Sequence, residues 1–426
     1  MENQIQVLEN QKKELEKKLN TKYIERTQVL QSEKMMANDL IKVVLGPRRA
    51  GKSVFCWLLL KDKHFAYLNL EDDNLQTNGI NSMDLLHQLF TVYGETKYLF
   101  FDEIQNLEKW ELFVNRLHRE GYNLVLTGSN AKLLSKELAT HLTGRHIPIE
   151  LMPFNFKEFL SAKDFQLETK NLKAPETKRL FMSLLELYMT NGGYPEIVLK
   201  DNSPQEYFDT LYDALLFKDV IKRYKVRFFS LIEDLGTYLI NNIASEFSFR
   251  KISHILNFKN IATLQKYVSY FEEAYIISTM GRYSYKTGER LALPKKVYTV
   301  DNGYIAAKAI QFSNNKGKLL ENMIFSELLK KGFKPNHNLF YYKTRNQKEV
   351  DFIIRENLQI TSLIQVAYNV DDQKTKKREI KALLEASKEL NCNNLTILTW
   401  DNETIQIVKN KQIKFVPVWK WLLEIM

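Results

Sequence analysis

Eight consecutive residues constrain the fold of this 426-residue chain more than any other feature. Residues 46–53 read G-P-R-R-A-G-K-S and match the pattern G-x4-G-K-[S/T]. An apolar run at 41–45 precedes them, and a helix-favouring stretch at 52–60 follows. This is the strand–loop–helix context that the pattern requires.

The pattern predicts a phosphate-binding loop. Glycine lets backbone N–H groups close around phosphate oxygens, and the N-terminus of the following helix adds partial positive charge. The loop consists of Gly46, Pro47, Arg48, Arg49, Ala50, Gly51, Lys52 and Ser53. We expect ATP and Mg²⁺ as ligands, with Lys52 on the β- and γ-phosphates and Ser53 on the metal.

An acidic pair follows a later apolar run. Residues 98–101 read as a buried strand, and Asp102 and Glu103 come directly after it. We expect Asp102 to hold Mg²⁺ through water and Glu103 to orient and deprotonate the attacking water. A strand that is merely capped by acids is the alternative, and the upstream loop disfavours it.

Three more polar positions are candidates for the same reaction. Ser129 and Asn130 follow the apolar run at 124–126, where a polar side chain can sense the γ-phosphate. Arg145 stands just before another short strand and could neutralise charge at the nucleotide of a neighbouring subunit. An ordinary loop and a plain surface arginine are the respective alternatives.

Short apolar runs alternate with helical stretches from residue 41 onward, which predicts an α/β fold with an open parallel sheet. The expected strands are 41–45, 65–70, 98–101, 124–126 and 146–151. Before them, an apolar seam at Ile5, Leu8, Leu15 and Leu19 predicts an amphipathic helix or a short coiled coil. We divide the chain into a helical segment (1–40), an ATPase core (41–160), a helical lid (161–230), a winged helix (231–310) and a C-terminal α/β domain (317–426).

Charge and cysteine content restrict the partners and the compartment. The formal net charge is +10, which suggests an anionic partner such as nucleic acid, although a general bias toward lysine would give the same value. The two cysteines form no zinc pattern and fit a reducing cytoplasm. The longest apolar run, at 54–60, is far too short to cross a bilayer, so we expect no membrane partner.

The ordered motifs resemble one large prokaryotic family. After G-P-R-R-A-G-K-S come F-D-E-I-Q, L-T-G-S-N, L-T-G-R, G-G-Y-P-E at 192–196, D-N-G at 301–303 and E-V-D-F at 349–352. In this order they are similar to the archaeal-type AAA+ ATPases that carry the C-terminal domain of unknown function DUF4143. The resemblance implies an AAA+ core, a winged helix and a nuclease-like C-terminal module.

A DNA-binding element is expected in the winged-helix region. Residues 249–256 and 260–268 fit two short helices joined by a tight turn, as in a helix-turn-helix. A β ribbon at 274–300, with its turn at 286–288, would form a basic wing containing Lys295 and Lys296. The candidate DNA contacts are Arg250, Lys251, Thr263, Gln265, Lys266, Arg282, Lys286 and Arg290. A winged helix that serves only packing or subunit contact is the alternative.

The C-terminal region resembles the PD-(D/E)xK nuclease fold in layout, with Glu321 on a helix and Asp351 at a strand hairpin. An active member needs Glu-x-Lys on the next strand to bind Mg²⁺ and polarise water. Here Gln365 and Ala367 occupy those two positions, so we expect a degenerate module without nuclease activity.

These observations predict an ATPase that remodels DNA or moves along it. Its expected partners are DNA, bound without a strict sequence code, and further copies of the same chain, with a hexameric ring as one candidate assembly. The alternatives are a slow nucleotide-controlled switch for signalling or assembly and a structure-specific nuclease.

Overall fold

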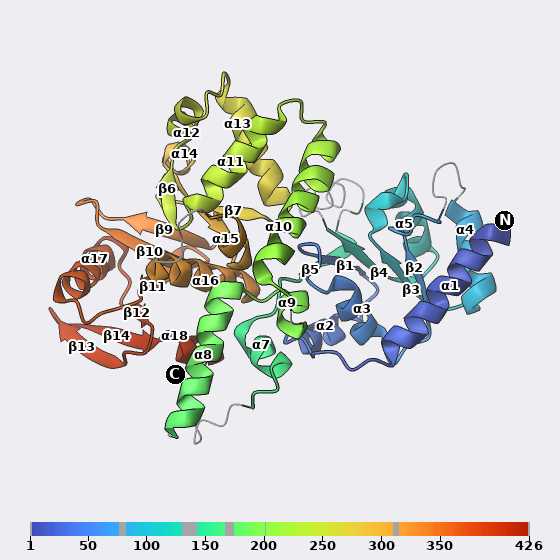
Figure 1. Ribbon diagram of the computed structural model, residues 1–426, viewed down its shortest axis with the longest axis horizontal. Coiled ribbons are helices and arrows are strands. Elements are labelled where there is room, and N and C mark those ends of the chain that lie inside the picture. The colour runs from blue at the N-terminus through green and yellow to red at the C-terminus, as the bar shows by residue number, and fades with distance from the viewer. Residues whose placement is uncertain are drawn as a thin grey trace. The chain divides into compact units, whose positions relative to one another are not determined.

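The computed structural model describes residues 2–75, 82–129, 142, 144–166, 174–200, 202–309 and 315–424 (Figure 1). The chain forms two compact units, Met1–Phe154 and Asn155–Met426. Among the described residues, no helix combines the length and the apolar content that crossing a bilayer requires.

A five-stranded parallel sheet forms the centre of the first unit, with the strand order β2-β3-β4-β1-β5. Its strands are β1 (Ile41–Leu45), β2 (Phe65–Asn69), β3 (Tyr98–Asp102), β4 (Asn123–Gly128) and β5 (His146–Glu150). Most of their residues are buried, as expected for a parallel sheet that is covered on both faces. The predicted α/β fold with a parallel sheet is therefore confirmed.

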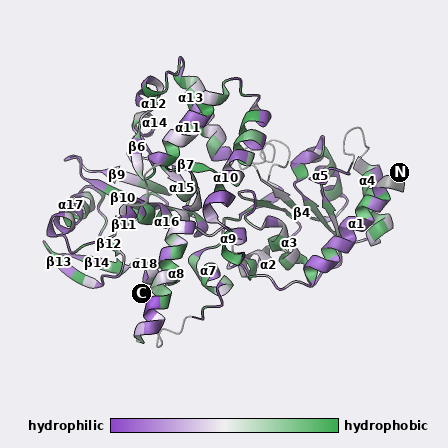
Figure 2. Cartoon of the chain, in the orientation of Figure 1, coloured by the Kyte–Doolittle hydropathy of each residue, from purple (hydrophilic) through white to green (hydrophobic). Residues whose placement is uncertain are grey.

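Helices alternate with these strands. They are α1 (Glu2–Leu19), α2 (Val29–Met35), α3 (Lys52–Leu60), α4 (Ser82–Tyr93), η1 (Ile104–Asn106) and α5 (Trp110–Arg119). Figure 2 shows hydrophilic and hydrophobic residues along α1. Its buried residues Leu8 and Leu15 belong to the core of this unit, and Gln11 Nε2 donates to the backbone oxygen of Asn69 at 3.1 Å. Two of the four seam residues, Leu8 and Leu15, thus pack within the unit that contains the sheet, whereas Leu19 is exposed.

Helices dominate the first part of the second unit. They are α7 (Phe156–Ala162), α8 (Pro175–Asn191), α9 (Pro195–Leu199), α10 (Pro204–Leu215), the π-helix η3 (Leu216–Lys222), α11 (Phe229–Asn241) and α15 (Gly303–Lys308). The break between α8 and α9 is held by buried Asp301, whose carboxylate accepts hydrogen bonds from Gly193 N at 2.8 Å and Gly303 N at 2.9 Å. Gly192 has φ +77°, and a Cβ there would clash with Asp301. The motifs G-G-Y-P and D-N-G therefore meet in one buried joint.

A small antiparallel sheet in the second unit has the strand order β6-β8-β7. The elements are β6 (Ser245–Phe247), α12 (Phe249–Ile255), α13 (Ile261–Glu273), β7 (Ile277–Gly281), α14 (Thr287–Ala292) and β8 (Lys295–Thr299). The expected turn of a β ribbon at 286–288 is wrong, because helix α14 begins there. Helices α12 and α13 agree with the predicted pair.

A six-stranded mixed sheet completes the second unit, with the order β13-β14-β12-β11-β10-β9. Its strands are β9 (Leu339–Lys343), β10 (Glu349–Glu356), β11 (Gln359–Ala367), β12 (Leu395–Thr399), β13 (Thr404–Val408) and β14 (Lys411–Pro417). The accompanying helices are α16 (Lys316–Lys330), α17 (Gln373–Leu390) and α18 (Val418–Leu423). Strands β11, β12 and β14 run parallel, and β9, β10 and β13 pair antiparallel with their neighbours.

Candidate nucleotide site and a second charged cluster

The loop between β1 and α3 is shaped by glycines at both ends. Gly51 caps α3 with φ 90° and ψ 26°, in the left-handed region that glycine adopts without strain. At the other end, a Cβ on Gly46 would lie 2.0 Å from the backbone oxygen of Leu151. The sequence pattern thus reflects two backbone requirements, a left-handed turn and a close approach between chain segments.

Lys52 lies at the start of α3 and is 6% exposed. Its ammonium donates to the backbone oxygens of Gly46, at 3.2 Å, and Pro47, at 3.1 Å. The same ammonium lies 3.5 Å from Oε1 of Glu103. The lysine of the loop and the second acid of the strand motif therefore face each other.

Asp102 ends β3 and is buried among hydroxyl groups. Its carboxylate accepts hydrogen bonds from Thr127 on β4 and from Tyr67 on β2, the latter at 3.1 Å. Burial raises the pKa of Asp102, and hydrogen bonds from Thr127 and Ser53 oppose this rise. Ser53 and Asp102, the two candidate metal ligands, are thus already hydrogen-bonded to each other.

Glu103 follows Asp102 with a left-handed backbone, φ 54° and ψ 53°. Its N–H donates to Thr127 Oγ1 at 2.8 Å, and Gln105 Nε2 donates to its Oε2 at 2.5 Å. Burial raises the pKa of Glu103, but the charges of Lys52 and Arg48 together with hydrogen bonds from Gln105 and Ser129 outweigh this effect, and the pKa lies below its ordinary value. A left-handed non-glycine residue at such a place is typical of functional sites. Glu103 is therefore ionised at neutral pH.

The remaining candidates fall in different places. Ser129 follows β4, is 3% exposed and lowers the pKa of Glu103, so it lies beside that carboxylate. Asn130 lies outside the described residues. Arg145 is exposed, and its backbone oxygen accepts from Ile41 N at 2.9 Å. Since β1 and β5 begin at Ile41 and His146, Arg145 lies at the amino ends of the strands, at the edge opposite Lys52.

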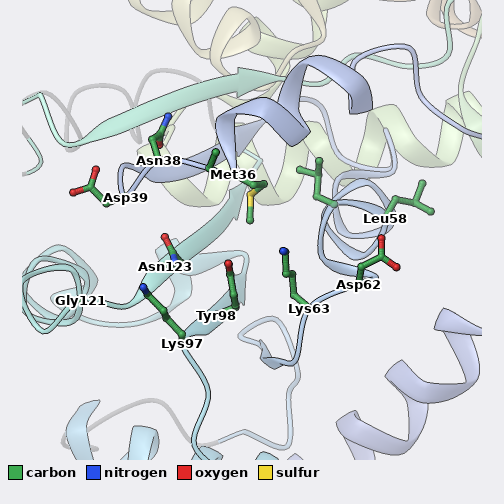
Figure 3. A pocket seen from close by; sticks show the side chains of 12 residues that line it. Met36, Asn38, Asp39, Leu58, Asp62, Lys63, Lys97, Tyr98, Gly121 and Asn123 are labelled. Carbon is green, nitrogen blue, oxygen red and sulfur yellow. The ribbon is translucent and has the colours of Figure 1, made fainter.

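A hollow of about 580 Å³ also lies at that opposite edge (Figure 3). Its lining includes Tyr98 and Asn123, the first residues of β3 and β4, together with Asp39, Lys63 and Lys97. The phosphate-binding loop follows the carboxyl end of β1. This hollow is therefore separate from the candidate nucleotide site.

The residues that resemble a nuclease site gather around a lysine from another sheet. Lys296 on β8 is 1% exposed, and its ammonium lies 2.9 Å from Glu321, 2.6 Å from Glu349 and 3.2 Å from Asp351. Tyr298 donates to Glu321 Oε1 at 2.8 Å. Lys296 therefore does not belong to an exposed basic wing, because it neutralises buried acids.

Gln365 and Ala367 lie on β11, beside this cluster. Gln365 accepts a hydrogen bond from Asp351 N at 3.3 Å and donates to Glu379 Oε2 at 2.5 Å. Burial, followed by the charge of Asp351, raises the pKa of Glu321 to about 7. Within the described ranges, no group of three or more His, Cys, Asp or Glu residues is arranged to hold a metal ion. The ammonium of Lys296 thus lies between the carboxylates of Glu321, Glu349 and Asp351.

The candidate DNA contacts on α12 and α13 are accessible. Arg250, Lys251, Gln265 and Lys266 are exposed, and Thr263 is half-buried. On the other side of α13, the residues Leu264, Val268 and Phe271 are buried. Each helix has a side-chain cap, from Ser248 and Asn260 respectively.

The candidate contacts that follow β7 have partners within the second unit. Arg282 Nη2 donates to the backbone oxygen of Lys343 at 2.9 Å. Lys286 pairs with Glu289 at 3.1 Å, and the guanidinium of Arg290 lies 5.9 Å from the ring centre of Phe340. These three side chains thus take part in local packing or pairing.

Sequence reasoning missed three residues that shape the nucleotide site. Thr127 bonds to both acids, Tyr67 bonds to Asp102, and Gln105 bonds to Glu103. Thr127 is the threonine of L-T-G-S-N, but the sequence interpretation favoured the polar residues that follow it, Ser129 and Asn130. Tyr67 lies within the apolar strand β2, so no sequence pattern marked it as a site residue.

Comparison with known proteins divides the chain into three matched parts. Family models match an AAA domain at residues 38–160, a domain of unknown function (DUF8612) at residues 182–316 and another (DUF4143) at residues 316–421. An uncharacterized protein of Methanocaldococcus jannaschii is 39% identical over 400 residues, which cover 90% of this chain and 88% of the relative. One from Haemophilus influenzae is 30% identical over 355 residues, which cover 78% of this chain and 84% of the relative.

Solved structures show weaker likeness. A Walker-type ATPase of Pyrococcus abyssi has a TM-score of 0.43 at 14% identity, covering 66% of this chain and 95% of its own. A signal transduction ATPase with a tetratricopeptide repeat sensor, from Pyrococcus horikoshii, has a TM-score of 0.28 at 14% identity, covering 72% and 46%. Likeness of this degree says nothing of activity or partners.

Proposed function

Because this chain belongs to the archaeal-type AAA+ P-loop ATPase family that carries a C-terminal DUF4143 domain, we propose that it hydrolyses ATP with Mg²⁺. One observation supports the proposal most. The ammonium of Lys52 faces Glu103 at 3.5 Å, while Ser53 and Asp102 share a hydrogen bond at the same edge of the sheet. Cation, metal ligands and base thus come from two separate sequence segments, the loop with the start of α3 and the end of β3.

The donor set fits a small, hard cation. Mg²⁺ prefers oxygen ligands and keeps several of its waters, so one hydroxyl and one carboxylate that lie together suit it. Ser53 and Asp102 would hold the ion, which when bound would neutralise charge on the β- and γ-phosphates. Lys52 would exchange its bonds to backbone oxygens for bonds to phosphate oxygens.

Glu103 is the proposed general base. Its pKa lies below the ordinary value because the charges of Lys52 and Arg48 and two side-chain hydrogen bonds together outweigh the effect of burial, so the carboxylate is ionised and can accept a proton from water. Gln105 and the backbone bond to Thr127 hold it in one orientation. Ser129, beside Glu103, is the proposed γ-phosphate sensor, together with Asn130.

Arg145 is proposed to act on the nucleotide of a neighbouring subunit. It lies at the amino ends of the parallel strands, whereas the phosphate-binding loop follows their carboxyl ends. One chain therefore cannot bring Arg145 to its own Lys52 without unfolding β1 or β5. An oligomeric ring, with six subunits as a candidate number, would supply the contact.

DNA is the proposed partner of the second unit. Helices α12 and α13 together with the sheet β6-β8-β7 form the proposed winged helix, and the exposed residues Arg250, Lys251, Gln265 and Lys266 support contact with DNA. With few base-reading side chains, contact would depend on phosphates and shape. We further propose that the module around Lys296 does not cleave nucleic acid, since that ammonium lies among the carboxylates.

Phosphate release from ATP tests the proposal directly. We expect turnover that requires Mg²⁺ and is lost in Lys52→Ala, because no other side chain in the loop supplies that ammonium. Lys61→Ala is a matched control, since Lys61 is an exposed residue at the end of the same helix. Equal turnover in wild type and Lys52→Ala would refute the assignment.

A further inference from the structure

A buried arginine that precedes β1 contacts the phosphate-binding loop. Arg26 lies between α1 and α2 and is 7% exposed. Its Nη1 donates to the backbone oxygen of Ala50 at 3.0 Å, and its Nη2 donates to that of Met152 at 2.5 Å. The guanidinium lies 5.1 Å from the ring centre of Phe154. Arg26 thus connects the loop to the segment that follows β5.

The bond to Ala50 fixes the orientation of one peptide group. The described backbone has no cis peptide bonds, and in a trans peptide the carbonyl and the following N–H point in opposite directions. With the Ala50 oxygen directed at Arg26, the N–H of Gly51 is directed away from it. Gly51 caps α3, and N–H groups at such a helix N-terminus are those that bind phosphate.

The bond to Met152 connects the phosphate-binding loop, through Arg26, to the segment that follows β5. At its first residue, Gly46 approaches Leu151 so closely that no Cβ would fit, and Leu151 N donates to Leu45 O at 2.7 Å. At its far end, Ala50 is joined through Arg26 to Met152. Both ends of the loop are therefore anchored to residues 151–152.

We propose that Arg26 is a positioning residue that holds the loop in its phosphate-binding conformation before nucleotide arrives. The proposal rests on the proposed ATPase function. A lysine fits this role poorly, because the two carbonyls are reached from two separate nitrogens of the planar guanidinium, Nη1 and Nη2, whereas an ammonium has a single nitrogen. The charge of Arg26 also adds positive potential around the loop.

ATP affinity and turnover of Arg26→Ala and Arg26→Lys test the proposal, with exposed Arg119→Ala as the control. A hydrogen bond from a charged donor is large enough that each variant should bind ATP at least about tenfold more weakly. Turnover at saturating ATP should fall much less. Added methylguanidinium should restore part of the affinity in Arg26→Ala and none in Lys52→Ala.

Two results would overturn the positioning role. One is wild-type ATP affinity in Arg26→Ala, and the other is a loss that methylguanidinium leaves unchanged, which would make the residue purely structural. If Arg26→Ala does not fold, the ATP affinity of Arg26→Lys relative to the wild type tests the proposal instead. Wild-type protein that neither binds nor hydrolyses ATP would instead refute the proposed function itself.

An independent feature in the second unit joins exposed aromatic and basic side chains around the π-helix η3. Phe217, Phe228 and Phe229 are 61%, 62% and 55% exposed. Between and beside them, Lys218, Lys222, Lys225 and Arg227 are exposed as well. We call these residues the Phe–Lys surface.

The Phe–Lys surface is firmly anchored and carries positive charge. Asp219, the acid in this stretch, is buried and pairs with Arg223 at 3.0 Å, so it does not offset the exposed cations. Tyr224 stacks on Tyr270 of α13 with ring centres 3.8 Å apart. π-helical segments occur frequently at functional sites, and clustered apolar side chains in water mark interaction surfaces.

We infer that the Phe–Lys surface binds single-stranded nucleic acid. Exposed phenyl rings stack on unpaired bases, and interleaved lysines contact the phosphates between them. The geometry differs from the proposed winged helix, which would contact a duplex. A single strand is favoured over an apolar partner because four exposed cations lie in the segment between Phe217 and Phe228.

Fluorescence anisotropy with labelled oligo(dT) tests this inference on the full-length chain. Phe217→Ala combined with Phe228→Ala should weaken binding at least about tenfold, the scale of losing stacked bases. Leu112→Ala removes an equally exposed apolar side chain elsewhere and should have no effect. Unchanged oligo(dT) binding would overturn the inference, as would a loss of self-association instead, measured by sedimentation.

Discussion

Asp102 and Glu103 are neighbours in sequence but have opposite electrostatic environments. Burial among the hydroxyls of Tyr67 and Thr127 leaves the pKa of Asp102 above its ordinary value, whereas Lys52 and Arg48 bring the pKa of Glu103 below its own. Environments that shift the pKa values of two carboxyl groups in opposite directions suit the groups to different roles. The motif predicted the pair and its roles, but the hydroxyls come from neighbouring strands and could not be located from the motif.

Glu321 permits a prediction about pH. Burial, followed by the charge of Asp351, raises its pKa to about 7 from an ordinary value of 4.5. An unfolded chain would release this proton near pH 4.5 and the folded chain near pH 7, so its contribution to stability falls as pH rises between these values. Glu321→Gln should therefore flatten the pH dependence of the melting temperature between pH 5 and 7.

Exposed Glu356→Gln, on the neighbouring strand β10, is the matched control for Glu321→Gln. It should leave the pH profile of the melting temperature as in the wild type. If the wild type and Glu321→Gln lose stability in parallel over this range, the buried carboxyl does not titrate there.

At the scale of elements, hydrophobic periodicity predicted the strands of the parallel sheet and the pair α12–α13. It failed at 286–288, where a lysine and a glycine suggested a turn and helix α14 begins instead. The pairing of Lys286 with Glu289, one helical turn apart, helps to stabilise that helix. Strands β13 and β14 were also missed, since their polar outer positions obscure the apolar alternation.

Helices α12 and α13 and the segment after β7 should respond differently to charge reversal. Lys251→Glu with Lys266→Glu should weaken duplex binding and reduce its salt dependence while leaving the melting temperature unchanged, because both residues are exposed. Arg282→Glu should instead lower the melting temperature, since it loses a bond to Lys343. DNA affinity that is equal in all variants at low salt would show that these helices serve packing.

For the whole molecule, two compact units carry distinct chemistry. The first contains the proposed nucleotide site, where Lys52 lies 3.5 Å from Glu103. In the second, Lys296 ties the small antiparallel sheet to the six-stranded sheet through buried ion pairs. No sequence pattern could place Lys296 there, because its acidic partners follow much later in the chain.

Assembly of copies can be tested by mixing two inactive variants. Arg145→Ala alone should reduce turnover by about 10³–10⁵-fold, the known scale for an arginine supplied to another subunit's nucleotide. Mixing it with Lys52→Ala should restore part of the activity, since some interfaces then combine an intact loop with an intact arginine. A fully active monomer, or no recovery on mixing, would contradict the ring.

The central claim is that this chain hydrolyses ATP with Glu103 as the base. Its most direct test is a parallel measurement of ATP binding and single-turnover hydrolysis in the wild type and Glu103→Gln. Removing a general base while keeping the side chain's shape should slow hydrolysis by about 10²–10⁴-fold and leave ATP bound. Hydrolysis at the wild-type rate in Glu103→Gln would contradict the account.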